Sequence, residues 1–352
     1  AYRDAEKGFN IPFGSAELEA KSVSAYKSLV DSLFSAADSS LSMNRTGDDI
    51  GKTTGRFAKQ SEARGETIRE TFEAVQALMR RFMPKTGRYT AEDVSRLANA
   101  IAAMGIAAKA LLETRQRVRR RQSFGRFLAD HPLVRHDLLD LSVRQAGGLA
   151  LALAAVEAFD RAWHERPPYG EAYHLARFLS HLAKNRTAEH SAEITRLAME
   201  LFGGLGFLEE YAVARWHRES LITPIWEGPS NIQALDLLEA MQKKGAHRPF
   251  LAWLEARLKG RSEEAEGALA AARKTLDRLA ALEPEAAQFS AKTALRRLAD
   301  AAAVAGLLEA SATAGPRYRE LAGLYARRFL LGEDYPPEAL GARALYLPEG
   351  GA

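Results

Sequence analysis

The sequence predicts a mainly α-helical fold, all-α in class, centred on an antiparallel four-helix bundle with helical additions at both ends. Three observations support this prediction. Apolar residues recur with a period near 3.6 over long segments, and proline or glycine residues separate these segments. No segment of convincing length alternates apolar with polar residues, as a half-buried strand would.

Four long segments make up the predicted bundle. They span 91–121, 132–164, 170–202 and a last helix that starts near Ser230. Glycine or proline residues follow each of the first three, and short connections between long helices place successive helices antiparallel. In the last helix, the apolar positions are Ile232, Leu235, Leu238 and Met241. Residues 207–220 are predicted to be irregular or to form a short helix.

The chain divides into three predicted parts. Residues 1–89 form an N-terminal helical segment, 90–244 the bundle and 245–352 a C-terminal helical extension. Within the extension, the period predicts helices over 249–259, 263–281, 286–314 and 316–331. A tail rich in proline and glycine follows from Gly332.

Composition excludes several classes of protein. The 352 residues include no cysteine, so disulfides, thiolate catalysis and cysteine-ligated metals are excluded. The histidines show no metal-ligand spacing, and we expect no metal site. A net charge of +4 is small for this length and not typical of a dedicated nucleic-acid binder. The start of the chain has no signal pattern and no apolar run reaches about 18 residues, so we expect a cytoplasmic protein with no membrane segment.

One carboxylate stands in an unusual setting. In the run Ile225-Trp226-Glu227-Gly228-Pro229-Ser230-Asn231, Glu227 lies between an aromatic ring and a glycine, just before an apolar helix. The ring would exclude water and the glycine would let a substrate approach the backbone, which suits a general base. The alternative is structural: Glu227 and Ser230 would cap the helix N-terminus.

Two other runs could bind a cofactor. An arginine cluster ends in Arg121-Gln122-Ser123-Phe124-Gly125, where guanidinium groups beside a hydroxyl suit a diphosphate. The alternative is a solvated basic face. About 80 residues later, Gly203-Gly204-Leu205-Gly206 would let the backbone approach a flat or phosphorylated ligand, or would simply end a helix.

Together, these three motifs resemble the C-terminal helical domain of the flavin-dependent acyl-CoA dehydrogenase family over about residues 91–241. The tryptophan before Glu227 and the roughly 110 residues after the bundle are most similar to one branch. That branch contains the adaptive-response proteins induced by DNA alkylation, whose extra C-terminal helices are implicated in DNA binding.

The resemblance implies an FAD-dependent oxidoreductase that acts on an acyl-CoA-like thioester. Glu227 would be the base that removes the α-proton, while the flavin takes the β-hydride. It also implies a homo-oligomer, a dimer or tetramer, whose flavin sites are shared between subunits. The resemblance also implies the cofactor-binding residues. These are Arg121 and Ser123 at the FAD diphosphate of a neighbouring subunit, Phe124 beside that cofactor, Gly203 and Gly204 near the adenosine, Asn231 near the flavin, and Trp226.

Two alternatives belong to other functional classes. One is a DNA-associated flavoprotein with little dehydrogenase turnover, which would bind duplex DNA through basic residues of the last region. These residues are Lys243, Lys244, Arg248, Arg257, Lys259, Arg296, Arg297, Arg327 and Arg328. The other alternative is a cofactor-free helical protein that has kept only the bundle.

Overall fold

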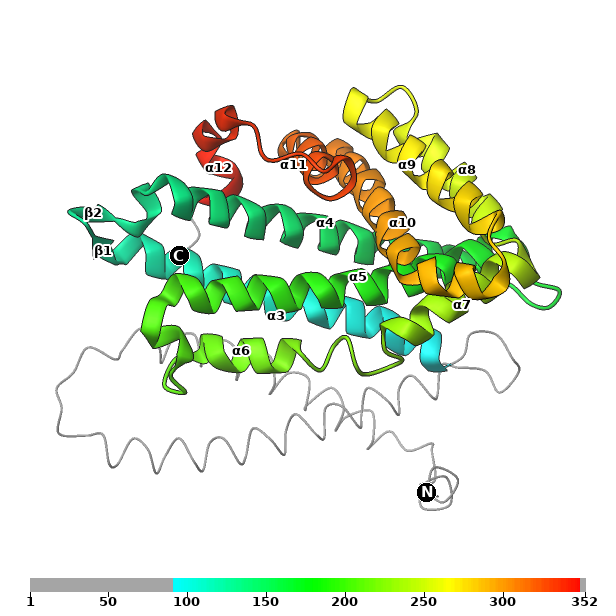
Figure 1. Ribbon diagram of the computed structural model, residues 1–352, viewed down its shortest axis with the longest axis horizontal. Coiled ribbons are helices and arrows are strands. Elements are labelled where there is room, and N and C mark those ends of the chain that lie inside the picture. The colour runs from blue at the N-terminus through cyan, green and yellow to red at the C-terminus, as the bar shows by residue number, and fades with distance from the viewer. Residues whose placement is uncertain (1–90, 349–352) are drawn as a thin grey trace, which may run out of the picture. The chain divides into compact units, whose positions relative to one another are not determined.

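The computed structural model describes residues 91–348, and the predicted N-terminal segment 1–89 lies outside the described residues. Helices dominate this part of the chain, which confirms the predicted fold class (Figure 1). The longer helices are α3 (Ala91–Arg120), α4 (Pro132–Ala162), α5 (Glu171–Phe202), α6 (Ala212–Ser220), α7 (Ser230–Lys244), α8 (His247–Leu258), α9 (Glu263–Ala280), α10 (Pro284–Thr313) and α11 (Arg317–Ala326).

Shorter elements connect these helices. A two-stranded antiparallel hairpin pairs β1 (Gln122–Ser123) with β2 (Arg126–Phe127) after α3. The remaining short elements are η2 (Leu128–Asp130), η3 (Gly203–Phe207), η4 (Arg327–Leu331), η5 (Pro337–Gly341) and α12 (Arg343–Tyr346). In the described residues, this hairpin is the whole of the β structure.

The bundle has three long members and one broken member. Helices α3, α4 and α5 lie side by side, with successive helices running in opposite directions (Figure 1). The predicted fourth helix, α7, is only part of the fourth member of the bundle. Helix α6 packs on α3 and α5, the chain then turns through 221–229, and α7 packs on α5 and α10. The break places the Trp-Glu-Gly turn between two helices.

The apolar face of α7 differs from the prediction. Leu238 and Met241 are buried, but Ile232 and Leu235 are more than two-fifths exposed. Ala234 and Leu237 face the core in their place. Helix α7 packs on both α5 and α10. The positions of these two helices, and not the apolar residues alone, therefore decide which side of α7 is buried.

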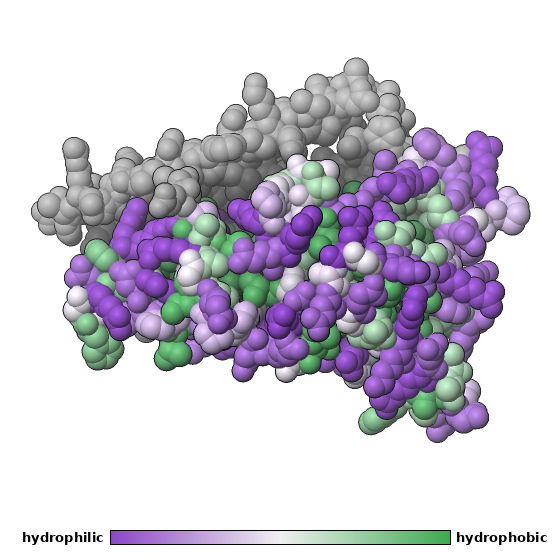
Figure 2. Space-filling view, turned by 90° about the horizontal axis from the view of Figure 1, so that it is seen from above, coloured by the Kyte–Doolittle hydropathy of each residue, from purple (hydrophilic) through white to green (hydrophobic). Residues whose placement is uncertain are grey.

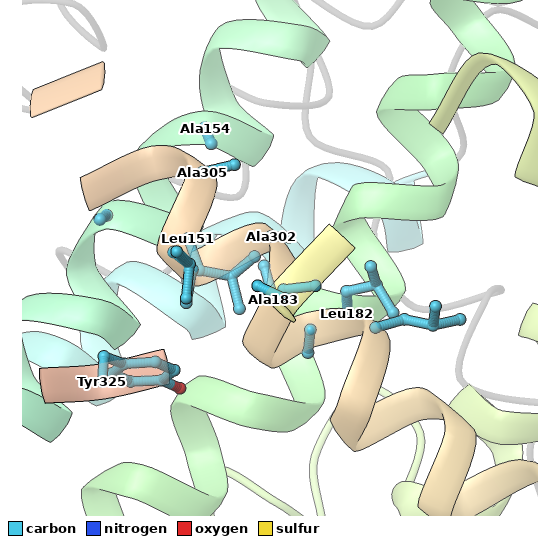
Figure 3. Close-up of a cluster of buried hydrophobic side chains, with 14 of the residues drawn as sticks. Leu151, Ala154, Leu182, Ala183, Ala302, Ala305 and Tyr325 are labelled. Atoms are coloured by element: carbon cyan, nitrogen blue, oxygen red, sulfur yellow. The ribbon is translucent and has the colours of Figure 1, made fainter. Parts of the chain in front are cut away.

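Helices α4, α5 and α10 approach closely because small residues line their contacts. Figure 3 shows Ala154 and Ala305, and Ala183 and Ala302, near the larger Leu151 and Leu182. A Cβ atom added at Gly306 would lie 2.8 Å from the carbonyl oxygen of Ala150. Two backbones this close leave no room for a side chain, so glycine is required at that position.

A buried polar cluster ties the C-terminal extension to the bundle. Arg186 on α5 donates to both carboxylate oxygens of Asp300 on α10, with distances of 2.6 and 3.1 Å. The hydroxyl of Tyr325 on α11 donates to Asp300 at 2.7 Å and lies 2.6 Å from His190 Nε2. Burial raises the pKa of Asp300, against the opposing effect of Arg186, and burial lowers the pKa of His190.

The extension packs directly on the bundle through α10 and α11. The domain boundary at residue 244 is not marked by a gap in this packing and stays a prediction. Hydrophilic side chains dominate the face seen from above in Figure 2, with small apolar patches between them. The tail rich in proline and glycine contains buried aromatic and aliphatic side chains. These are Tyr335, Ala339, Leu345, Tyr346 and Leu347.

Helices α3 and α4 are the two described helices that are long and apolar enough to cross a membrane by length and composition. Half of the apolar stretch in α3 and about two-thirds of that in α4 are buried within the protein. Packing against α5 therefore accounts for much of their apolar character.

Candidate active site

Glu227 lies on a strained turn between α6 and α7. Its φ angle is +59°, and that of Gly228 is +93°. A residue other than glycine rarely adopts a left-handed conformation, and such strain persists only where the surroundings hold it. The turn is therefore a defined structure that presents one carboxylate in one place.

Side chains from three helices hold this turn through its carbonyl groups. Lys184 Nζ on α5 donates to Gly228 O at 2.6 Å and to Pro224 O at 3.3 Å. Gln233 Nε2 on α7 donates to Glu227 O at 2.9 Å. Asn99 Nδ2 on α3 donates to Thr223 O at 2.9 Å.

The carboxylate of Glu227 accepts a hydrogen bond from Ser95 Oγ on α3, at 2.7 Å. Glu227 is half-buried, and the neighbouring Trp226 is 38% exposed. The capping alternative is wrong, because α7 begins after Pro229 and no side chain caps its N-terminus. Asn231 lies exposed in the first turn of α7.

The arginine cluster divides between two tasks. Arg115 Nε donates to Tyr346 O at 2.8 Å, and an Arg119 nitrogen donates to Pro348 O at 2.6 Å. These arginines hold the C-terminal segment, so the whole cluster is not a diphosphate site. Arg121 is exposed at the end of α3, where the hairpin begins.

The hairpin presents an exposed aromatic ring. Phe124 has a φ angle of +50° and Gly125 one of +78°, the left-handed pair that a two-residue hairpin turn requires. The Phe124 side chain is 96% exposed. His131 Nε2 lies 3.0 Å from Ser123 O, and the imidazole ring meets the Phe124 ring edge-on. His131 therefore anchors the hairpin that carries Phe124.

Gly203 and Gly204 present open backbone. Gly203 ends α5 with a φ angle of +69°, and a Cβ atom at either glycine would meet no atom within 4 Å. Packing needs only the third glycine of the run, because a Cβ at Gly206 would lie 2.1 Å from Met199 O. The first two glycines are therefore free to approach a ligand.

The predicted site residues form two groups in one chain. Arg117 lies 5.9 Å from the ring centroid of Phe202, so the ends of α3 and α5 that carry the hairpin and the glycines meet. The Glu227 turn rests on Lys184, 19 residues before Gly203 on α5. At 1.5 Å per residue, the two groups are separated by about 28 Å along the helix.

Lys184 and Ser95 are site residues that the sequence reasoning missed. Lys184 is only 1% exposed, and burial lowers the pKa of its ammonium group to about 8. The Arg96 guanidinium lowers that pKa further, while Glu227 opposes the change. The detectable signal was a lysine on the buried face of α5, between Ser180 and Thr187.

Comparison with known proteins identifies the bundle. Residues 90–242 match the family described as acyl-CoA dehydrogenase, C-terminal domain. This segment is similar to acyl-CoA dehydrogenase C-terminal domains. The 3-methylmercaptopropionyl-CoA dehydrogenase of Ruegeria pomeroyi is 40% identical over 112 residues, which cover 32% of this chain and 19% of that protein. AidB of Escherichia coli is 33% identical over 140 residues, covering 40% of this chain and 25% of AidB.

Solved structures extend the likeness of fold beyond residues 90–242. ACDH-11 of Caenorhabditis elegans, in complex with C11-CoA, has a TM-score of 0.59 and 20% identity, covering 74% of this chain and 48% of that chain. An acyl-CoA dehydrogenase complexed with FAD from Bacillus anthracis has a TM-score of 0.56 and 18% identity, covering 73% and 51%. The chain spans about a fifth to a quarter of the curated relatives named above.

Proposed function

We propose that the protein is an FAD-dependent acyl-CoA dehydrogenase-like oxidoreductase in which Glu227 removes the α-proton of an acyl-CoA thioester. The observation that carries this proposal is the Glu227 carboxylate on a strained turn, within a segment similar to acyl-CoA dehydrogenase C-terminal domains. A conformation that costs free energy and is held by three helices is typical of a functional position.

The residues fit FAD at the exposed end of the bundle. The open backbone at Gly203 and Gly204 can approach the nucleotide, and the exposed Phe124 ring can pack on the cofactor. Arg121 and Ser123 can bind a diphosphate, since a guanidinium donates in the geometry that phosphate accepts. When bound, FAD would supply the acceptor for the hydride that leaves the β-carbon.

The chain's own contribution is proton transfer. A carboxylate accepts a proton only where it meets the carbon acid in a fixed orientation. The hydroxyl of Ser95 orients Glu227 through Oε1, which leaves the other oxygen for the α-proton. The partly exposed indole of Trp226 would cover the bound thioester and exclude water beside the carboxylate.

A second copy of the chain would complete the site. The groups around Glu227 and around Gly203 lie about 28 Å apart along α5, too far to meet around one reacting carbon. This separation supports a homo-oligomer, a dimer or tetramer, in which the hairpin and glycines of one subunit hold the cofactor used by Glu227 of another.

Duplex DNA is the weaker proposal for a partner. Several of the basic side chains offered for it already have acidic partners, in the extension or in the bundle. These pairs are Arg257 with Glu309, Arg296 with Glu189, Arg327 with Glu264, Arg328 with Asp334, and Lys243 with Glu239. Counterion release requires free positive charge, so these ion pairs reduce the affinity expected for a phosphate backbone.

The test is anaerobic titration of the FAD-loaded full chain with saturated acyl-CoA. The proposal predicts bleaching of the flavin absorption in the wild type. Glu227→Gln keeps the amide shape without the base, so it should retain bound FAD and lose the bleaching. Glu239→Gln, the same change at an exposed position of α7, should still bleach. Equal bleaching by wild type and Glu227→Gln would refute the assignment of the base.

A further inference from the structure

We infer that Lys184 is a positioning residue for Glu227, because one buried ammonium group holds both ends of the segment that carries the carboxylate. The catalytic part of this inference rests on the proposed function. Pro224 O and Gly228 O flank the tripeptide Ile225-Trp226-Glu227, and both accept hydrogen bonds from Lys184 Nζ, at 3.3 and 2.6 Å.

The geometry explains why the strained conformation persists. Carbonyl groups at the two ends of a short loop point at the same nitrogen, so the loop cannot open without breaking a charge-assisted hydrogen bond. Lys184 belongs to the middle of α5, where neighbouring side chains are buried on all sides. Lys184 thereby fixes the turn to a rigid helix, as precise placement of a catalytic group requires.

Gln233 supplies a second, uncharged clamp. Its amide nitrogen donates to Glu227 O at 2.9 Å and to Gly228 O at 3.2 Å, and its oxygen lies 3.0 Å from His181 Nδ1. The amide therefore holds the turn from α7 while the ammonium holds it from α5. Of these two side chains, Lys184 alone reaches both ends of the tripeptide.

The ammonium also sets the charge beneath the turn. Arg96 from α3 and Glu227 from the turn both act on it, and Asp236 from α7 pairs with Arg96 at 3.0 Å. Burial and Arg96 lower the pKa of Lys184 to about 8. Near neutral pH, the ammonium carries a positive charge that stabilises a neighbouring carboxylate. Above pH 8 it becomes an amine, which keeps two N–H donors but has no charge.

The experiment compares Lys184→Met with the wild type and with Lys243→Met, the same change at an exposed lysine. The first readout is hydrogen exchange of residues 221–233, which needs no activity. The second is kcat and KM for acyl-CoA oxidation by the FAD-loaded full chain. Since a displacement of about 1 Å can cost about 100-fold, we expect kcat to fall about 100-fold with KM within about threefold.

Faster exchange of 221–233 together with the fall in kcat supports the inference. Exchange and kcat equal to those of Lys243→Met overturn it, as does an effect on KM alone. Lys184→Arg, which keeps charge and donors, should recover most of kcat and serves as the test if the methionine variant does not fold. A wild type that binds FAD without turnover refutes the proposed function, and hydrogen exchange then decides whether Lys184 holds the turn.

Discussion

Replacing Asp300 with asparagine should strongly destabilise the attachment of the extension to the bundle. The carboxylate is 3% exposed and accepts from two nitrogens of Arg186 and from the Tyr325 hydroxyl. Asparagine has the same volume but only one acceptor oxygen, and its amide N–H would face an N–H or O–H donor of Arg186 or Tyr325. Of the two acidic side chains paired with Arg186 in the described residues, only Glu189 would remain, at 3.0 Å.

The magnitude follows from the buried charge that remains. Removing one partner of a buried ion pair costs about 3–5 kcal/mol of the free energy of unfolding. Because Glu189 stays beside the guanidinium, we expect the lower end, about 3 kcal/mol. Replacing both partners, as Arg186→Met with Asp300→Leu, removes the uncompensated charge and should cost about 1 kcal/mol or less.

Urea unfolding of the full chain at pH 7 measures these differences. Arg273→Ala serves as the exposed control, since its pair with Glu255 lies at the surface and should contribute less than about 1 kcal/mol. A cost below about 1 kcal/mol for Asp300→Asn, or a double variant as unstable as the single one, would refute the reasoning.

Three further predictions concern the turn. Gly228→Ala places a Cβ 2.8 Å from Gln233 Nε2 at a φ angle of +93°, so it should lower the free energy of unfolding by about 1–3 kcal/mol. Gly204→Ala, which has open space around it, should change the free energy of unfolding little. Urea unfolding of both variants measures the difference. The pKa of Lys184 falls from 10.5 unfolded to about 8 folded, so the unfolded chain binds more protons between pH 8 and 10.5 and stability should rise with pH there. The gain is about 3 kcal/mol, and it should vanish from the pH dependence of unfolding in Lys184→Met. Ser95→Ala removes a 2.7 Å hydrogen bond to the candidate base and should lower kcat about tenfold at unchanged KM, and steady-state kinetics with kcat unaffected would contradict the role given to this hydroxyl.

Much of the helical architecture could be predicted from the sequence because its signals are local. The 3.6-residue period and the glycine at 203 mark α5, and Pro132 marks the start of α4. The broken fourth member of the bundle could not be predicted this way. The polar turn 221–229 is stabilised by side chains of α3 and α5, which no local pattern reveals.

The same difference separates the site residues that were found from those that were missed. Glu227 and Phe124 stand in unusual local runs, and the structure gives both a positive φ angle. Ser95 is 132 residues from the carboxylate it meets, and Lys184 is 44 residues from the Gly228 carbonyl it holds. Their roles depend on tertiary packing, so no motif announces them.

Charge patterns misled for a related reason. Arg115 and Arg119 stand in a dense basic cluster, yet both hold carbonyls of the C-terminal segment about 230 residues away. A guanidinium donates hydrogen bonds to a backbone carbonyl as well as to a phosphate. Sequence alone therefore cannot distinguish a structural arginine from a ligand-binding one.

Deuterium incorporation at the α-carbon of a saturated acyl-CoA tests the central claim most directly. The FAD-loaded full chain would be incubated with the thioester in D₂O, and the mass of the recovered thioester and its unsaturated product measured. We predict incorporation or oxidation with the wild type and neither with Glu227→Gln. Loss of the α-proton at equal rates in both proteins, or its retention in an FAD-loaded wild type, would contradict the assignment of Glu227 as the base.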